Sequence, residues 1–274
     1  MSKPSPVGSV MITAARAAGR ALARDFGEVE NLQVSKKGPG DFVSNADHRA
    51  EEIIYSQLSK ARPGYGFVME ERGIIEGTDK SNRFIVDPLD GTLNFLHGQP
   101  HYCVSIALER EGKLLVGVVF DVAKNEIFWA ETGRGAWLEQ RKLRVATRRK
   151  LADSVIATGT PWVGKSEAWH IGFAREIAAM TPVCAGIRRY GSAALDLAWV
   201  AAGRFDGFWE RDLKAWDIAA GVVLVREAGG YVEEIDGGDM LTTGSVVAGN
   251  EDILPLVQKQ IRHAGAFGKA AAID

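Results

Sequence analysis

The chain reads Phe-Ile-Val-Asp-Pro-Leu-Asp-Gly-Thr-Leu-Asn-Phe over residues 84–95. The apolar start of this stretch predicts a strand, and Pro88, which cannot donate a ladder hydrogen bond, is expected to stop it. Gly91 then allows a turn. The carboxylates of Asp87 and Asp90 can therefore point toward one place at the end of the strand.

The same stretch supplies a set of oxygen ligands. Two carboxylates, the Leu89 carbonyl and the Thr92 hydroxyl lie within six residues, and such oxygens are the ligands that hard divalent cations prefer. Thr92 also lies where the N-cap of a helix belongs. Taken alone, the stretch fits an Asx turn with a capped helix equally well. Other acidic residues in the sequence are needed to distinguish this interpretation from a cation site.

Further acids stand at the ends of other predicted elements. Glu70 and Glu71 end a short strand, Asp217 opens a helix, and Asp47 comes just before another. Each one alone is more simply a helix cap or a surface acid. If they converge with the aspartates of residues 84–95, each like-charge pair about 4 Å apart costs about 4 kcal/mol at an effective dielectric of roughly 20. Such a site requires cations, and without cysteine or histidine ligand pairs these would be magnesium or manganese, not zinc.

Periodicity and turn residues predict helices in the first half at 7–26 and 46–61, on either side of a turn-rich segment at 36–41. Short strands follow at 67–69 and 84–86. Three consecutive strands are then expected. They lie at 103–109, 114–121 and 125–130 and form a meander. The first half should therefore place helices beside an antiparallel sheet.

In the second half, strands alternate with helices, which is typical of a layered α/β arrangement. The predicted elements are a strand at 155–157 and helices at 166–180, 192–201, 217–228 and after residue 250.

We therefore expect an α/β fold, α+β in the first half (residues 1–147) and α/β in the second (148–274). The sequence has no internal repeat, low-complexity tract or long linker. The halves should pack as a single domain over residues 1–274, with a site between them.

Composition argues against several classes of protein. The chain has 274 residues, 46% of them hydrophobic, enough for a substantial core. Its formal charge of -2 gives no broad positive field, so nucleic acid is not the expected partner. No apolar run approaches the roughly 18 residues of a membrane span. Cys103 and Cys184 form no CxxC pair, which suits a reducing compartment and predicts a cytoplasmic location.

A rival motif occupies residues 159–166, where Gly-Thr-Pro-Trp-Val-Gly-Lys-Ser matches the P-loop pattern G-x-x-x-x-G-K-[ST] between a predicted strand and helix. Pro161 lacks an amide where a P-loop wraps a phosphate. The strand and helix alternation also begins at this point of the chain, not before it. A surface connection, whose lysine caps a strand end or faces water, is favoured, and nucleotide binding is the alternative.

A basic run is found at 141–150, with Arg141, Lys142 and Arg144 followed by Arg148, Arg149 and Lys150. A solvated strand edge that discourages edge pairing is the favoured interpretation. The alternative is docking onto RNA or an acidic protein, which would make the chain an interaction factor.

Four segments together resemble the inositol monophosphatase family of lithium-sensitive, magnesium-dependent phosphatases. They are 84–95, 216–221 with 227–230, 41–47 and 190–194, and they occur in the family's order across most of the chain. The resemblance implies the layered αβαβα sandwich of the inositol monophosphatase and fructose-1,6-bisphosphatase type, and a homodimer. It also implies hydrolysis of a phosphomonoester, most simply of a small polyol phosphate such as inositol 1-phosphate.

The resemblance assigns roles to individual residues. The implied ligands of two or three Mg²⁺ ions, for which Mn²⁺ could substitute, are Glu70, Asp87, the Leu89 carbonyl, Asp90 and Asp217. Thr92 and Glu70 would orient or deprotonate the attacking water, and Asp47 would support it or help to hold a further metal ion. The implied substrate contacts are Asp90, Gly91, Thr92, Gly191, Ser192, Ala193, Glu210 and Asp217.

Two points stay open at this stage. Met69 stands where the family usually has glycine before the two glutamates, which puts the shape of that edge of the pocket in question. Relatives with the same metal ligands act on histidinol phosphate, fructose 1,6-bisphosphate or nucleotide phosphates, so those activities are alternatives.

The expected chemistry is direct attack by water, because no histidine or cysteine nucleophile is evident.

Overall fold

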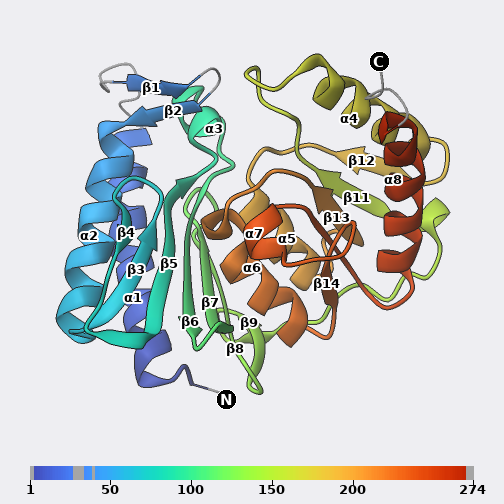
Figure 1. The fold of residues 1–274 in the computed structure, drawn as a ribbon. Coiled ribbons are helices and arrows are strands. Elements are labelled where there is room, and N and C mark those ends of the chain that lie inside the picture. The colour runs from blue at the N-terminus through green and yellow to red at the C-terminus, as the bar shows by residue number, and fades with distance from the viewer. Residues whose placement is uncertain (1–2, 27–33, 39–40, 270–274) are drawn as a thin grey trace.

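The structure is a computed structural model that describes residues 3–26, 34–38 and 41–269. Figure 1 shows two sheets with a pair of helices between them and further helices on both outer faces. The layers therefore follow the expected order of helix, sheet, helix, sheet and helix.

The first sheet has eight strands in the order β10-β9-β8-β7-β6-β5-β3-β4. Its strands are β3 (Tyr65–Met69), β4 (Gly73–Ile75), β5 (Asp79–Asp90), β6 (Cys103–Arg110), β7 (Lys113–Asp121), β8 (Glu126–Glu131), β9 (Gly135–Leu138) and β10 (Arg141–Lys142). The predicted meander is confirmed. The expectation of a purely antiparallel sheet is wrong, because β3 pairs parallel with β5. β4 pairs antiparallel with β3 at the edge of the sheet. The chain then crosses to the other side of β3, where β5 runs in the same direction as β3.

Two helices cover the outer face of this sheet, α1 (Pro6–Phe26) and α2 (Asn45–Ala61) (Figure 1). Both were predicted within one residue. In the segment 36–41, expected as a turn, residues 36–38 belong to β1 (Val34–Gly38) and residue 41 begins β2 (Asp41–Ser44), which pairs antiparallel with β1 and leads into α2. Residues 39–40 lie outside the described residues.

β5 does not stop at Pro88 as predicted, but continues to Asp90. Asp87 pairs with Ser105 and Asp90 with Cys103, so two residues of β5 face one of β6 in a bulge. A bulge removes the need for a ladder amide, which is why proline is tolerated there.

The helix after this bulge, α3 (Thr92–Leu96), also differs from expectation in one respect. Its N-cap is Gly91, at a φ of 90°, and Thr92 is the first helical residue. Glycine adopts this left-handed conformation without strain.

The second sheet has five strands in the order β12-β11-β13-β15-β14. They are β11 (Val155–Thr158), β12 (Gly186–Arg188), β13 (Gly207–Glu210), β14 (Tyr231–Glu234) and β15 (Val246–Gly249). The outer helices here are α4 (Glu167–Met180) and α8 (Ile253–Lys269), with a 3-10 turn at Leu151–Asp153. The short helix α7 (Met240–Thr243) lies on the opposite side of this sheet and packs against the central core. The predicted alternation is confirmed. The boundary proposed near residue 147 lies between β10 and β11 and stays a prediction.

The central layer consists of α5 (Ala193–Ala201) and α6 (Ala215–Glu227). One apolar core joins these helices to strands of both sheets. Small residues allow the close approach: a Cβ on Gly117 of β7 would overlap the carbonyl oxygen of Ala220, and one on Gly221 would lie 2.5 Å from the Leu197 Cβ. α6 therefore lies almost directly on the backbone of the first sheet.

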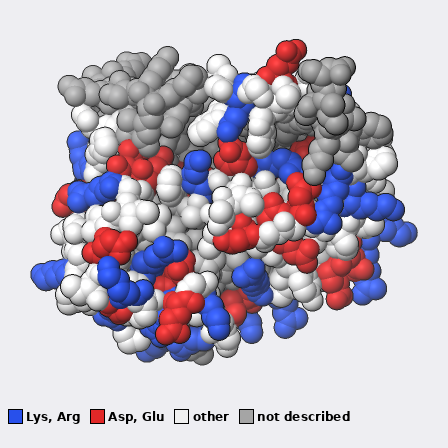
Figure 2. All heavy atoms as spheres, in the orientation of Figure 1, with Lys and Arg blue, Asp and Glu red and all other residues white. Residues whose placement is uncertain are grey.

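The face shown in Figure 2 carries acidic and basic side chains intermixed, as the small net charge predicts. Arg141 and Lys142 of β10 are exposed at one end of the eight-stranded sheet, which confirms a charged strand edge. Among the described helices, none combines the length and apolar character that crossing a membrane would require.

We predict that Gly117→Ala destabilises the protein by about 1–3 kcal/mol, because the added methyl group meets backbone that cannot move without shifting α6. Gly172→Ala in α4 is the matched control, since nothing lies within 4 Å of its added Cβ. It should raise stability by about 0.5–1 kcal/mol through helix propensity. Urea unfolding of both variants tests the pair, and equal effects would contradict the close contact.

Candidate functional site

Carboxylates from three separate segments meet where α6 begins against the first sheet. Glu70 directly follows β3, and its amide donates to the Val86 carbonyl at 3.2 Å, so it lies beside the end of β5. The Ser105 hydroxyl donates to the Trp216 carbonyl at 3.3 Å. Because Ser105 is the β6 partner of Asp87, this bond holds the first turn of α6, with Asp217, next to β5.

The electrostatics show that these acids influence one another. Asp87 is buried, and its pKa is raised well above the ordinary value, first by burial and then by Glu70, Asp90 and Asp217. The pKa of Asp217 is likewise raised by burial, then by Asp90 and Glu70. Four carboxylates therefore repel one another in a poorly hydrated place.

Asp90 connects this cluster to the central layer. Its Oδ2 accepts hydrogen bonds from the Ser192 hydroxyl at 2.6 Å and from the Ala194 amide at 2.9 Å. One amide at the start of α5 is therefore used inside the protein. Asp90 therefore caps the helix that follows the Gly191–Ala193 segment.

Asp47 is both a helix cap, which was one interpretation of its position, and a neighbour of Thr92. Its Oδ2 accepts from the amide and hydroxyl of Ser44 at 2.8 and 2.7 Å at the start of α2. The Thr92 hydroxyl lies 3.2 Å from Asp47 Oδ1 and 2.9 Å from the Leu89 carbonyl oxygen. Asp47 thus reaches the cluster through Thr92. Burial raises its pKa, against these hydrogen bonds.

The donor set suits a hard divalent cation, but it is not preassembled. Within the part of the chain that the structure describes, no group of three or more acidic, histidine or cysteine side chains is arranged to hold a metal ion as it stands. Besides the bonds to Asp90, Asp87 Oδ1 accepts from the Leu89 amide at 2.9 Å and Asp217 Oδ2 from the Lys214 amide at 2.7 Å. Oxygen ligands and uncompensated negative charge fit Mg²⁺ or Mn²⁺ in kind.

Met69 does not line this site. Its side chain is fully buried in the core between the first sheet and the outer helices. The adjacent edge is held to α2, because the Glu71 amide donates to Glu51 at 2.8 Å and Arg72 pairs with the same carboxylate at 3.2 Å.

Glu210, at the end of β13, approaches the cluster from the second sheet. Burial, then Asp217 and Asp90, raise its pKa to about 8, and Arg189 opposes that rise. A Cβ on Gly159 would overlap the Glu210 carboxylate. The first glycine of the P-loop-like motif, Gly159, therefore leaves space for the Glu210 carboxylate. In a phosphate-binding loop, this glycine would instead allow the backbone to approach a phosphate.

Thr160, Pro161, Trp162 and Lys165 of that motif line a cavity of about 740 Å³. Glu210 and Asp217 also belong to its wall. Lys165 pairs with Asp212 and lies 5.2 Å from the Trp162 ring and 5.1 Å from the Trp169 ring. The connection is a loop, as favoured, but its lysine neither caps a strand nor faces open water, since its side chain is only 22% exposed.

Two residues near the site were missed by sequence reasoning. The Asn94 side-chain amide donates to the His101 carbonyl at 2.8 Å and the Tyr190 carbonyl at 2.7 Å, which ties α3 to the approach of α5. Asp196 of α5 is fully buried, and neither carboxylate oxygen has a hydrogen-bond partner among the described residues. A lone acid in an otherwise apolar helix was its only signal.

Comparisons with known proteins agree on one family. The sequence model of the inositol monophosphatase family matches residues 3–266. A protein named inositol-1-monophosphatase from Mesorhizobium japonicum is 59% identical over 93% of this chain and 95% of its own length. Nus factor SuhB of Escherichia coli is 42% identical over 94% of this chain and 96% of its own.

Solved structures resemble the chain along almost all of its length. The extragenic suppressor protein suhB from Bartonella henselae has a TM-score of 0.91 and 53% identity, covering 94% of this chain and 98% of that one. Thermotoga maritima IMPase has a TM-score of 0.84 and 32% identity, covering 94% and 97%.

We predict that Asn94→Ala costs about 1–3 kcal/mol of stability, since two carbonyls lose their donor. Amide hydrogen exchange should also accelerate at residues 190–194. Asn250→Ala is the matched control, because Asn250 donates in the same way to the Ala146 and Arg148 carbonyls at 2.8 and 2.7 Å. It should lower stability without affecting 190–194. Unchanged exchange there in Asn94→Ala would contradict the tie.

Proposed function

Because the chain belongs to the inositol monophosphatase family, we propose that it hydrolyses inositol 1-phosphate to myo-inositol and phosphate. The observation that carries this proposal is the meeting of Glu70, Asp87, Asp90 and Asp217 beside a cavity. Such a cluster repels a phosphate dianion unless cations compensate it, which fits a magnesium-dependent phosphatase.

The residues that would hold two or three Mg²⁺ ions, or Mn²⁺ in their place, are Glu70, Asp87, Asp90, Asp217 and the carbonyl of Leu89. When bound, Mg²⁺ supplies positive charge for the phosphate and acidifies water. Three of these carboxylates each accept a hydrogen bond from a backbone or hydroxyl donor, which ties them to the ends of their elements near the proposed site.

Thr92 and Glu70 would place and deprotonate the attacking water. The Thr92 hydroxyl is held by Asp47 and the Leu89 carbonyl, so Asp47 acts by orienting Thr92. Cys103 is the nearest thiol, but burial and Asp90 raise its pKa well above the ordinary value. It would stay a neutral thiol, a poor nucleophile, which supports direct attack by water with inversion at phosphorus.

On the substrate side, Gly191, Ser192 and Ala193 would contact the substrate beside Asp90, Gly91 and Thr92. Glu210 would bind hydroxyl groups of the polyol, since it reaches the cavity from the opposite sheet. Hydrolysis of histidinol phosphate or fructose 1,6-bisphosphate is the alternative on the same ligands. We further infer a cytoplasmic homodimer that lithium inhibits.

A second candidate function is docking onto RNA or an acidic protein. It is favoured by the exposed Arg141 and Lys142 of β10 and by the similarity to proteins named Nus factor SuhB. Against it, Arg148 pairs with Asp206 and Arg149 with Asp252, which offsets part of the basic charge. Binding to RNA that weakens steeply with salt would support this function.

We predict magnesium-dependent phosphate release from inositol 1-phosphate, with lower rates on histidinol phosphate and fructose 1,6-bisphosphate and none on ATP. Asp90→Asn should lower the rate at least about a hundredfold, because it removes a ligand charge and leaves a weaker, neutral acceptor for the start of α5. The exposed Asp153→Asn is the control and should leave the rate unchanged. Release from ATP alone would instead assign the site to the loop at 159–166.

We also predict that Mg²⁺ at a hundred times its dissociation constant stabilises the wild type by about 2.7 kcal/mol. Asp87→Asn should raise the stability of the metal-free protein, since one repelling charge disappears, and should remove most of the gain from Mg²⁺. Thermal unfolding with EDTA and with Mg²⁺ measures both effects. An equal magnesium gain in both proteins would rule out Asp87 as a ligand.

A further inference from the structure

The cavity beside Glu210 is larger than a polyol phosphate needs. Its volume of about 740 Å³ lies within the range of pockets that enclose drug-sized ligands, roughly 300–1,000 Å³. Glu210 and Asp217 belong to its wall, so it opens directly from the carboxylate cluster. A leaving group on a phosphate at the cluster would extend into this space.

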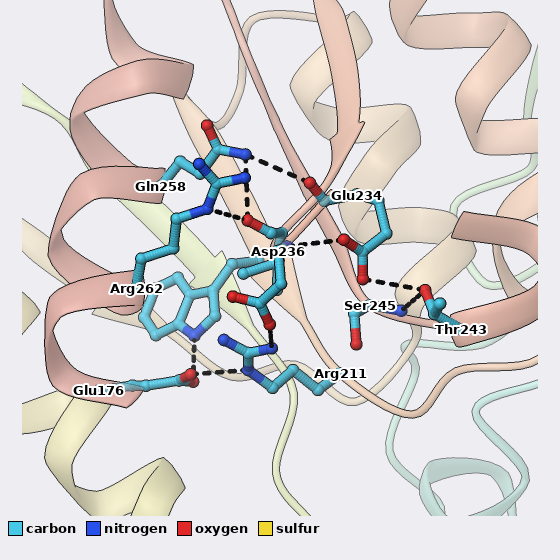
Figure 3. Close-up of polar contacts among 10 residues, drawn as sticks. Glu176, Arg211, Glu234, Asp236, Thr243, Ser245, Gln258 and Arg262 are labelled. Carbon is cyan, nitrogen blue, oxygen red and sulfur yellow. Dashed lines mark hydrogen bonds and ion pairs between the residues drawn. The ribbon is translucent and has the colours of Figure 1, made fainter. Parts of the chain in front are cut away.

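Charged groups in the cavity wall are largely matched within the protein. Figure 3 shows Arg211 between Glu176 and Asp236, with hydrogen bonds of 2.7 and 2.8 Å. Lys165 pairs with Asp212. These cations are therefore already neutralised, and they offer little to a second phosphate on the leaving group.

Arg262 of α8 is also engaged, because it donates to the carbonyl of Ile235 (Figure 3). Lys214, the remaining cation in the wall, lies near Asp217 and opposes the rise in the pKa of that carboxyl. Its charge is thus directed at the cluster. Formal charges in the outer wall balance, with Lys165, Arg211 and Arg262 against Glu176, Asp212 and Asp236, so no net charge remains to select an ionic leaving group.

Flat aromatic surfaces remain as the outer wall. Trp162 and Trp169 are 39% and 38% exposed, although tryptophan usually packs more completely. Phe173 lines the same space. Both indoles line the cavity, and the Lys165 ammonium lies close to both, 5.2 Å from the Trp162 ring and 5.1 Å from the Trp169 ring. A flat ring that enters the cavity can stack on the exposed part of either indole.

We propose that this cavity is a leaving-group subsite, through which the enzyme also hydrolyses phosphomonoesters whose alcohol carries an aromatic ring on a short alkyl chain. The inference rests on the proposed phosphatase function and extends it. In the reaction, water attacks phosphorus, the bond from phosphorus to the ester oxygen breaks, and that oxygen takes up a proton. Inorganic phosphate and the aromatic alcohol are released, and no further reactant is needed.

The test compares 2-phenylethyl phosphate with propyl phosphate, which lacks the ring, in the presence of Mg²⁺. Stacking worth about 1.4 kcal/mol predicts about a tenfold higher kcat/KM for the aromatic ester, mainly through a lower KM. Trp162→Ala and Trp169→Ala should each remove most of this advantage and leave kcat on propyl phosphate within about twofold. Tyr231→Ala, which removes an aromatic side chain of similar exposure outside the cavity, should retain it.

A second measurement separates the subsite from the activity. Binding of 2-phenylethanol, which has no phosphate, should shift the indole NMR signals of Trp162 and Trp169, and Tyr231→Ala should leave these shifts unchanged. If the wild type releases phosphate neither from inositol 1-phosphate nor from either ester but these shifts occur, the proposed function is wrong and the binding subsite stands. Equal kcat/KM for the two esters, an advantage that survives both tryptophan changes, or absent shifts would overturn the subsite.

Discussion

The hydrogen bonds of Asp90 are the interaction on which the rest of the site depends. One carboxylate oxygen at the end of β5 accepts from both the Ser192 hydroxyl and the Ala194 amide. It thereby joins the first sheet to the start of α5, in the layer that both sheets share. A glycine at position 91 allows the turn that follows, and Asn94 adds a second tie to the same approach. The contact that joins these layers also places a carboxylate of the proposed metal site.

This arrangement works against stability in the absence of cations. Burial raises the pKa values of Asp87 and Asp217, and the nearby Glu70 and Asp90 add to that rise. Asp217 and Asp90 also raise the pKa of Glu210, which belongs to the second sheet. This repulsion between carboxylates is found where the two sheets and the central helices meet, beside the cavity. Positive charge from bound metal ions would relieve the repulsion and attract phosphate at the same time. The same carboxylate cluster would therefore both destabilise the metal-free protein and bind the metal ions of the proposed reaction.

The layered fold and most elements follow from the sequence, because apolar periodicity and turn residues are local signals. The predicted end of β5 at Pro88 was wrong, because the bulge that accommodates this proline depends on how β6 pairs with β5 and not on β5 alone. The parallel pairing of β3 depends in the same way on the path through β4. For the site, the acids were identifiable from their positions at element ends. The ties made by Asn94, the burial of Asp196 and the role of Gly159 depend on contacts between distant segments, which a single sequence does not display.

The most direct test of the account is the position of bound cations. Crystals grown with Mn²⁺ and measured by anomalous diffraction should show manganese between the carboxylates of Asp87 and Asp90, within reach of Glu70 and Asp217. That result would establish the carboxylate cluster as the metal site from which the proposed chemistry follows. Manganese bound only elsewhere, or a cluster that stays empty at millimolar Mn²⁺ while phosphate is released, would contradict it.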